Sequence, residues 1–251
     1  MLNGREVDPA ELLRSIERLE DFAHMACHDL RAPLRAMMSL IDWVREDLQE
    51  TYGDLPASIA DDLGELSRQG ERMSRFISDL LAFALVGRAQ EGPRHCRAAE
   101  EAEEAVRFCA IPKGFTVTIK PGLPDLAVDP VEFSMVLRNL LTNAVVHHDR
   151  SGGRIEIDHR IEGARCNVIV RDDGPGVAEK DGTLIFEVFR SVGLTRGHGI
   201  GLGVVRKIAL LYGAEPRVQT PASGRGAEFI VGFPCAAPQS SPAATAPLPR
   251  V

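Results

Sequence analysis

The sequence predicts an α-helical hairpin followed by an α+β domain, and three observations predict this. Apolar residues up to about position 85 recur at alternating spacings of four and three, the heptad pattern of packed helices. Residues 87–97 are polar, contain Gly and Pro, and are typical of a linker. After position 98 helical periodicity alternates with short segments typical of strands, which favours helices on one face of a mixed sheet.

In the hairpin, Pro33 interrupts the heptad pattern of the first helix, which resumes at Leu34, and the second helix keeps the pattern without a break. Residues 49–58 contain Gly53 and Pro56 and are the predicted turn. Because two helices bury a continuous apolar seam poorly, we expect a second copy of the chain and a dimeric four-helix bundle. The seam comprises Leu12, Ile16, Leu19, Ala23, Ala26, Leu30, Leu34, Met37, Ile41, Val44 and Leu48 in the first helix and Ile59, Leu63, Leu66, Gly70, Met73, Ile77, Leu80 and Ala84 in the second.

The rest of the chain divides into a globular domain and a tail. We expect the hairpin domain over 1–86, the linker over 87–97, the globular domain over 98–234 and a disordered tail rich in Pro, Ala and Ser over 235–251. Within the globular domain the patterns predict helices over 98–110 and 130–148 and after the glycines at 197–203, and strands over 115–120, 154–161, 166–172 and 227–233.

Composition restricts the class of protein. Of 251 residues 44% are hydrophobic, enough for a packed core, yet no run reaches the roughly 18 apolar residues of a membrane-spanning helix. A net charge of −7 disfavours nucleic-acid binding, and the charged N-terminus does not fit a signal peptide. The five cysteines contain no CxxC pair and fit reduced thiols. We therefore expect a cytoplasmic protein with no membrane insertion and no nucleic-acid partner.

The segment HDLRAPL begins with His28 and Asp29. The heptad pattern places His28 away from the seam and toward solvent, where a neutral imidazole is a competent nucleophile. Asp29 could accept the ring N–H and take up charge as the other nitrogen attacks. A surface His beside an Asp is also, more simply, a solvated pair.

Two glycine-rich segments could hold a ligand. DDGPG, from Asp172 to Gly176, ends an apolar strand and combines a carboxylate acceptor with glycines that permit close approach; an ordinary Asp-Gly turn is the alternative. GHGIGLG, from Gly197 to Gly203, precedes a helix, and its backbone N–H groups could bind an anion. This segment has neither a Walker A lysine nor dinucleotide-fold spacing, and a flexible hinge is its alternative.

Asn139 and Asn143 lie four residues apart in RNLLTNAVVHHD. On a helix they share a face, so both amide oxygens could meet one ligand or a Mg²⁺ held by phosphates. Helix capping or an ordinary polar surface is the alternative.

Five segments of the chain resemble, in this order, the H, N, G1, F and G2 boxes of the sensor histidine kinase family. They are HDLRAPL, NLLTNA, DDGPG, FEVF (Phe186–Phe189) and GHGIGLG. The resemblance spans Phe22 to Pro234, and HDLRAPL and NAVVHHDR look most like the phytochrome-type branch. It implies a HisKA-type dimerisation domain and a HATPase domain, an α+β sandwich of Bergerat (GHKL) type. Related ATPases carry a Glu where Asn139 stands, so phosphoryl transfer is favoured over hydrolysis.

The resemblance also implies roles. ATP and Mg²⁺ would be the cofactors, and a response regulator receiver domain would take the phosphoryl group. Because only about 20 residues precede the H box, the input signal would come from a separate sensor protein, the N-terminal helix or a domain outside this chain. His28 would be phosphorylated, with Asp29 as its acid–base partner. The nucleotide would be bound by three groups: Asn139 and Asn143 would hold Mg²⁺, Asp172 with Gly174 and Gly176 would bind adenine, and Gly197, Gly199 and Gly201 would close over the phosphates. Phe186 and Phe189 would anchor a lid.

Three departures from the family pattern raise a second hypothesis, although the retained Asp172, glycines and asparagines argue against it. Val146 stands where relatives carry a phosphate-binding Lys, and Arg190 or Arg196 could compensate for the missing cation. Ala32 replaces a residue that supports phosphatase activity in relatives, so we expect weak phosphatase activity. The segment from Phe189 to Gly197 makes a short lid. The alternative is a histidine phosphotransfer or scaffold protein with a degenerate ATP domain. A third hypothesis is an ATP-dependent switch that binds partners and catalyses no phosphoryl transfer.

Overall fold

The computed structural model describes residues 9–87, 95–178, 182, 184–188 and 199–237, with side chains from Met25 onward. The chain forms two compact units, one from residues 1–89 with 185–207 and the other from 90–184 with 208–251. Among the described residues no helix has the length and apolar character needed to span a bilayer.

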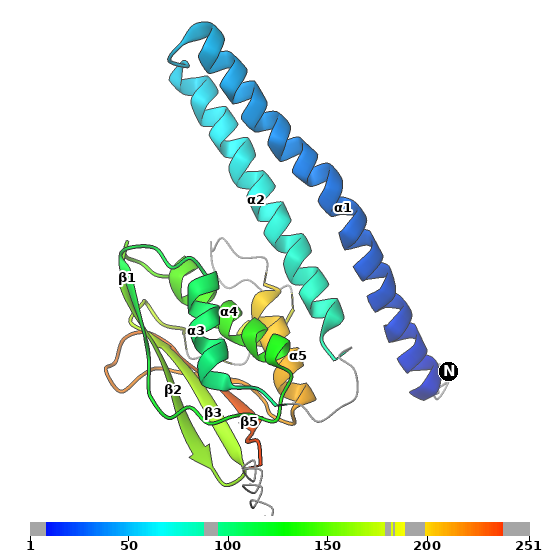
Figure 1. Ribbon diagram of the computed structural model, residues 1–251, viewed down its shortest axis with the longest axis vertical. Helices are drawn as coiled ribbons and strands as arrows, with labels where there is room; N and C mark the ends of the chain where they lie inside the picture. The colour runs from blue at the N-terminus through cyan, green and yellow to red at the C-terminus, as the bar shows by residue number, and fades with distance from the viewer. Residues whose placement is uncertain (1–8, 88–94, 179–181, 183, 189–198, 238–251) are drawn as a thin grey trace, which may run out of the picture. The chain divides into compact units, whose positions relative to one another are not determined.

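Two long helices, α1 (Pro9–Tyr52) and α2 (Ala57–Leu85), form the predicted hairpin (Figure 1). The short connection contains Gly53, whose positive φ of 74° suits a tight turn. The helix α1 continues through Pro33, so the interruption of the heptad pattern at this residue does not end the helix. A proline removes one backbone donor, and packing of the neighbouring Leu34 against the hairpin core keeps the helix continuous.

The predicted apolar seam divides into two sets. Leu34 is buried, while Leu30, Met37 and Val44 on the same helix are 55%, 56% and 45% exposed. A stripe of apolar residues wider than one partner helix leaves part of itself uncovered. The uncovered set recurs every seven residues and comprises Leu30, Met37 and Val44 on α1 with Ile59, Leu66 and Met73 on α2. We call these six residues the uncovered heptad stripe.

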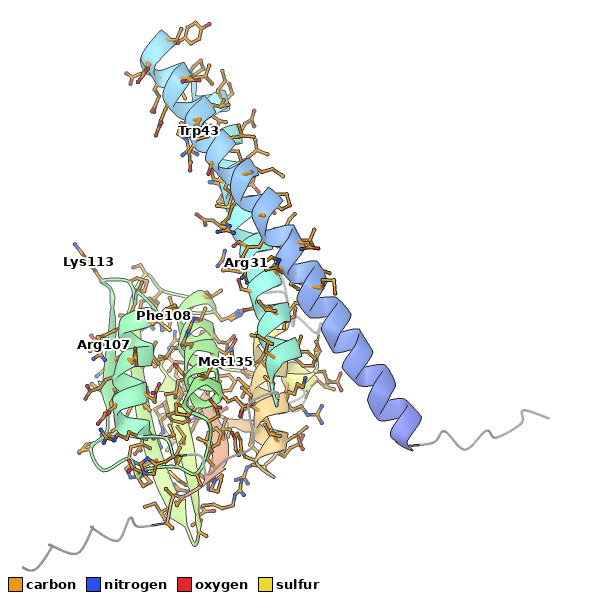
Figure 2. All side chains as sticks on the ribbon, turned by 45° about the vertical axis from the view of Figure 1, so that its right-hand side comes forward. Arg31, Trp43, Arg107, Phe108, Lys113 and Met135 are labelled. Atoms are coloured by element: carbon orange, nitrogen blue, oxygen red, sulfur yellow. The ribbon has the colours of Figure 1, made fainter. Side chains whose placement is uncertain are left out.

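Trp43 is also exposed on α1, but it falls outside this seven-residue spacing (Figure 2). The exposure of an apolar side chain alone therefore does not assign it to the uncovered heptad stripe.

The second unit contains a five-stranded sheet in the order β1-β2-β3-β5-β4. Among the described strands, β1 and β2 pair in parallel, and the other neighbours pair antiparallel. The strand β4 was not predicted, because three residues are too few to show an alternating pattern. The strands are β1 (Phe115–Ile119), β2 (Gly153–Glu162), β3 (Arg165–Asp172), β4 (Arg217–Gln219) and β5 (Glu228–Pro234).

The helices α3 (Ala98–Phe108) and α4 (Pro130–Val146) lie against this sheet, as predicted for an α+β domain (Figure 1). Asp129 caps α4 by accepting a hydrogen bond from Val131 N at 2.8 Å. The apolar face of α4 is fully buried and includes Phe133, Val136, Leu137, Leu140 and Leu141. This burial anchors the helix that carries both asparagines. The described residues also form a 3₁₀ helix, η2 (Leu184–Phe186), and the helix α5 (Gly201–Leu211).

The sheet unit includes residues from both segments predicted to flank it. Cys96, from the predicted linker, is fully buried and pairs through its backbone with Leu126, which also pairs with Cys235 from the predicted tail. Residues 95–97 and 235–237 therefore pack with the globular unit. The rest of the predicted linker and tail, 88–94 and 238–251, lies outside the described residues.

Candidate functional site

His28 and Asp29 lie side by side on α1, with side chains that are 78% and 74% exposed. The prediction that His28 faces solvent is confirmed. Its Nδ1 atom is 3.3 Å from Oδ1 of Asp29. An ionised carboxylate only accepts hydrogen bonds, so this contact assigns the ring proton to Nδ1 and leaves the lone pair on Nε2. Nε2 is therefore the nucleophilic nitrogen.

A cavity opens in the sheet unit at the end of α4 and β3. The cavity is small, with a volume of about 40 Å³. Three predicted residues line it together: Asn143, Asp172 and Gly176. The complete lining consists of Asn143, Ala144, His147, Asp172, Pro175, Gly176, Val177, Ala227 and Phe229.

Asp172 is the last residue of β3, and the backbone orients its carboxylate. Oδ1 accepts hydrogen bonds from Gly174 N at 3.0 Å and Ala227 N at 3.2 Å. Both bonds use Oδ1, which leaves Oδ2 to accept from a ligand. Burial raises the pKa of this carboxyl group, and the two backbone donors oppose the rise. The backbone therefore fixes the Asp172 carboxylate through Oδ1, and Oδ2 can accept a hydrogen bond from a ligand.

Asn139 and Asn143 lie one turn apart on α4. The side-chain amide of Asn139 donates from Nδ2 to Met135 O at 2.8 Å, which leaves Oδ1 as its acceptor atom. Asn143 lines the cavity with its half-buried side chain. Amide oxygens are hard ligands of the kind that Mg²⁺ accepts alongside phosphate oxygens and water. The donor set on this helix face therefore fits Mg²⁺.

Glycine is required at two places at the cavity: at Gly176, which lines it, and at Gly226, which precedes the lining residue Ala227. Gly176 has φ +82°, and a Cβ there would lie 2.6 Å from Gly226 O. Gly226 has φ +93°, and a Cβ there would lie 1.8 Å from Asp172 O. Gly174 is also close to its neighbours, because a Cβ would lie 3.0 Å from Asp172 Oδ1. Gly174 and Gly176 belong to the predicted DDGPG segment, whereas Gly226 was not predicted.

The glycine-rich segment before α5 is only partly described. Gly199 has φ +68° and Gly201 begins α5; both belong to the first unit. Phe186 is buried in η2. The roles predicted for these three residues stay predictions. Four other residues with predicted roles lie outside the described residues: Phe189, Arg190, Arg196 and Gly197.

His147 is a pocket residue that the sequence reasoning missed. It caps α4, donating its backbone N–H to Asn143 O at 3.0 Å, and its half-buried side chain lines the cavity. Burial lowers the pKa of His147, and the nearby Asp172 charge opposes this. A position four residues after Asn143 lies on the same helix face, and that spacing could have identified it.

Two family models match the chain. Residues 18–88 match the His Kinase A (phospho-acceptor) domain, and residues 128–237 match the histidine kinase-, DNA gyrase B- and HSP90-like ATPase. The first contains His28, and the second contains all the residues that line the cavity.

Similar proteins agree with these matches. The methanogenesis regulatory histidine kinase FilI of Methanothrix harundinacea is 29% identical over 86% of this chain and 24% of its own length. The alginate biosynthesis sensor protein KinB of Pseudomonas aeruginosa is 31% identical over 88% of this chain and 38% of its own. The crystal structure of full-length ShkA in complex with AMPPNP has a TM-score of 0.58 at 25% identity, covering 86% of this chain and 46% of that one.

The chain belongs to the sensor histidine kinase family, because a phosphoacceptor helical domain precedes a GHKL-type ATPase domain in one chain. The predicted fold class and family are confirmed. The chain spans less than half the length of the two curated relatives named here.

Proposed function

We propose that this chain phosphorylates itself on His28 with the γ-phosphoryl group of Mg-ATP and passes that group to an aspartate on a response regulator receiver domain. The observation that carries the proposal is the exposed His28 ring, whose Nδ1 lies 3.3 Å from the Asp29 carboxylate. This arrangement leaves Nε2 free to react in a domain of the phosphoacceptor family.

The first step forms one bond and breaks one. The Nε2 lone pair of His28 attacks the γ-phosphorus in line, an N–P bond forms, and the bond to the oxygen bridging the β- and γ-phosphorus atoms breaks, releasing ADP. The ring becomes positively charged, and Asp29 stabilises that charge or accepts the Nδ1 proton. In the second step the N–P bond breaks as a receiver carboxylate oxygen attacks phosphorus.

The cavity residues would bind the nucleotide. Oδ2 of Asp172 is suited to accept from the adenine amino group, while Gly174 and Gly176 shape the wall beside it. The amide oxygens of Asn139 and Asn143 would hold Mg²⁺, which when bound neutralises phosphate charge. The glycines predicted to close over the phosphates are Gly197, Gly199 and Gly201.

We also propose a homodimer through the hairpin. The uncovered heptad stripe presents large apolar side chains from both helices, including Leu66 and Met73, which are 53% and 52% exposed. Apolar residues that recur every seven positions on two antiparallel helices form the seam of a four-helix bundle when a second hairpin covers them. Covering this stripe removes apolar surface from water and stabilises the dimer.

Labelled ATP tests the proposed activity. The purified chain is incubated with γ-labelled ATP and Mg²⁺ beside His28→Ala, Asn143→Ala and a control, Asn167→Ala, which alters an asparagine on β3 outside the cavity lining. We expect acid-labile, base-stable label on the wild type and on Asn167→Ala, and none on the other two. Wild type that binds ATP without becoming labelled would contradict the proposal, as would wild type that accepts label only from a phosphorylated regulator.

A further inference from the structure

The backbone before β5 meets the end of β3 at the nucleotide pocket. Asp172 N donates to Ala227 O at 3.0 Å, and Ala227 N donates to Asp172 Oδ1 at 3.2 Å. Between these contacts Gly226 approaches so closely that a Cβ would lie 1.8 Å from Asp172 O. The position of the Asp172 carboxylate therefore depends on where residues 225–227 are held.

Arg225 connects this segment to two others. Its Nε donates to Asp173 O at 3.0 Å, directly after Asp172. Its Nη2 donates to both carboxylate oxygens of Asp149, at 2.7 and 2.8 Å. Asp149 follows the end of α4 by three residues and His147, a cavity residue, by two. One guanidinium group thus links the three chain segments that supply Asp172, His147 and Ala227 to the cavity.

The Asp173 segment is also held from its other side. Asp173 Oδ1 accepts from Arg154 N at 2.7 Å and contacts His148 Nε2 at 3.2 Å. The His148 side chain is fully buried, and its Nδ1 accepts from Arg150 N at 3.1 Å, so Nε2 carries the proton and donates. Arg154 and His148 therefore fix the Asp173 side chain, and Arg225 links the Asp173 backbone to the end of α4.

The link is electrostatic as well as geometric. The hydrogen bond from Arg225 is the main cause of the lowered pKa of Asp149. Arg225 and Asp149 are 40% and 43% exposed, so water weakens their attraction, although a guanidinium shared by two segments remains directional. We expect a moderate effect on pocket geometry rather than a large one on folding.

We propose that Arg225 is a positioning residue for nucleotide binding, which holds the Asp172 segment and the end of α4 at the separation that the nucleotide requires. The inference rests on the proposed nucleotide pocket and extends it to a residue outside the cavity lining. Arg225 itself touches neither the nucleotide nor the reacting atoms in this proposal. Its effect would pass through Asp172 and His147.

Isothermal titration of the full chain with Mg-ATP tests the proposal. We expect Arg225→Ala to bind about tenfold more weakly, which corresponds to losing one moderately strong charged hydrogen-bond link. Arg225→Lys and Asp149→Asn should each show a smaller loss, because each keeps part of the linkage. The matched control is Arg97→Ala, which removes an exposed ion pair with Glu100 on α3.

Affinity and stoichiometry separate a positioning role from a merely structural one. A structural defect lowers the fraction of chains that bind but leaves the Kd of that fraction unchanged, whereas loss of positioning raises the Kd at unchanged stoichiometry. A Kd for Arg225→Ala equal to that of Arg97→Ala would overturn the proposal while leaving the nucleotide pocket intact. If Arg225→Ala does not fold, wild-type affinity in both Arg225→Lys and Asp149→Asn overturns it. Wild type that binds no Mg-ATP overturns the proposed function and this inference together.

Discussion

The Nδ1 atom of His28 and the Oδ1 atom of Asp29 lie 3.3 Å apart on the solvent-facing side of α1. Neighbours in sequence on a helix point in different directions, so this contact requires both side chains to turn toward each other. A hydrogen bond between two side chains this exposed contributes little to stability. Its consequence is chemical, because it selects the tautomer with a free lone pair on Nε2.

Replacing Asp29 tests that consequence. We expect Asp29→Asn to slow autophosphorylation about 100-fold, because an amide cannot take up charge from the ring as Nε2 attacks. Nucleotide affinity should not change. Initial rates with labelled ATP measure this, with Asp47→Asn as a control at another exposed aspartate on α1. An Asp29→Asn rate equal to that of the control would show that Asp29 is only a neighbour.

Val146 offers a gain-of-function test. It is the last residue of α4, one turn after Asn143, and its side chain is 37% exposed. Lysine fits at such a position without disturbing the core and would bring a cation toward the phosphates. We expect Val146→Lys to bind Mg-ATP about fivefold to tenfold more tightly. Val131→Lys, at the opposite end of the same helix, is the control; equal affinities in the two variants would show that position 146 does not face the phosphates.

The uncovered heptad stripe predicts the oligomeric state. A charge placed in a buried apolar seam is costly, so we expect Leu66→Glu to convert the dimer to a monomer. Trp43→Glu alters an exposed apolar residue outside the seven-residue spacing and should remain dimeric. Sedimentation equilibrium distinguishes the two. Dissociation of both variants, or of neither, would assign the dimer to another surface.

The raised pKa of Asp79 predicts that the stability of the hairpin depends on pH. Burial raises its pKa to about 6 from the ordinary 3.8, with Arg75 opposing the rise. In the range between these values the folded state retains a proton that the unfolded state has lost. Stability therefore falls as pH rises from about 4 to about 6 and is level above that range.

The variant Asp79→Asn should remove this fall. At pH 7 we expect it to be about 1 to 2 kcal/mol more stable than the wild type, after discounting for partial solvent exposure. The advantage should disappear near pH 4. Urea unfolding at several pH values measures it, with Asp62→Asn as the exposed control on α2. A constant difference across this range would rule out ionisation of Asp79 as the cause.

The long-period features of this fold were predictable from sequence. Heptads identify α1 and α2, and alternation identifies β2 and β3, because each pattern repeats over many residues. The interruption of the heptad pattern at Pro33 does not end α1, because a single missing donor does not break a helix that packs along its length. The division of the apolar seam into buried residues and the uncovered heptad stripe could not be predicted from the sequence. It depends on which residues of α1 turn toward α2.

The site was predictable where its residues are close in sequence. Asn139 and Asn143 follow from the helical repeat, and Asp172 with its glycines follows from a motif. Gly226 and Arg225 were missed because they reach Asp172 and Asp173 only through the pairing of β3 with β5, more than fifty residues later in the chain. No local spacing encodes such a contact.

The most direct test of phosphoryl transfer to His28 is to locate the phosphoryl group itself. The chain is treated with Mg-ATP carrying label on either the α- or the γ-phosphate and digested at neutral pH, and the peptides are sequenced by tandem mass spectrometry. We expect label from γ-labelled ATP alone, confined to the imidazole of His28. Label on any other residue, or an unmodified His28 in a chain that has bound Mg-ATP, would contradict the proposed reaction.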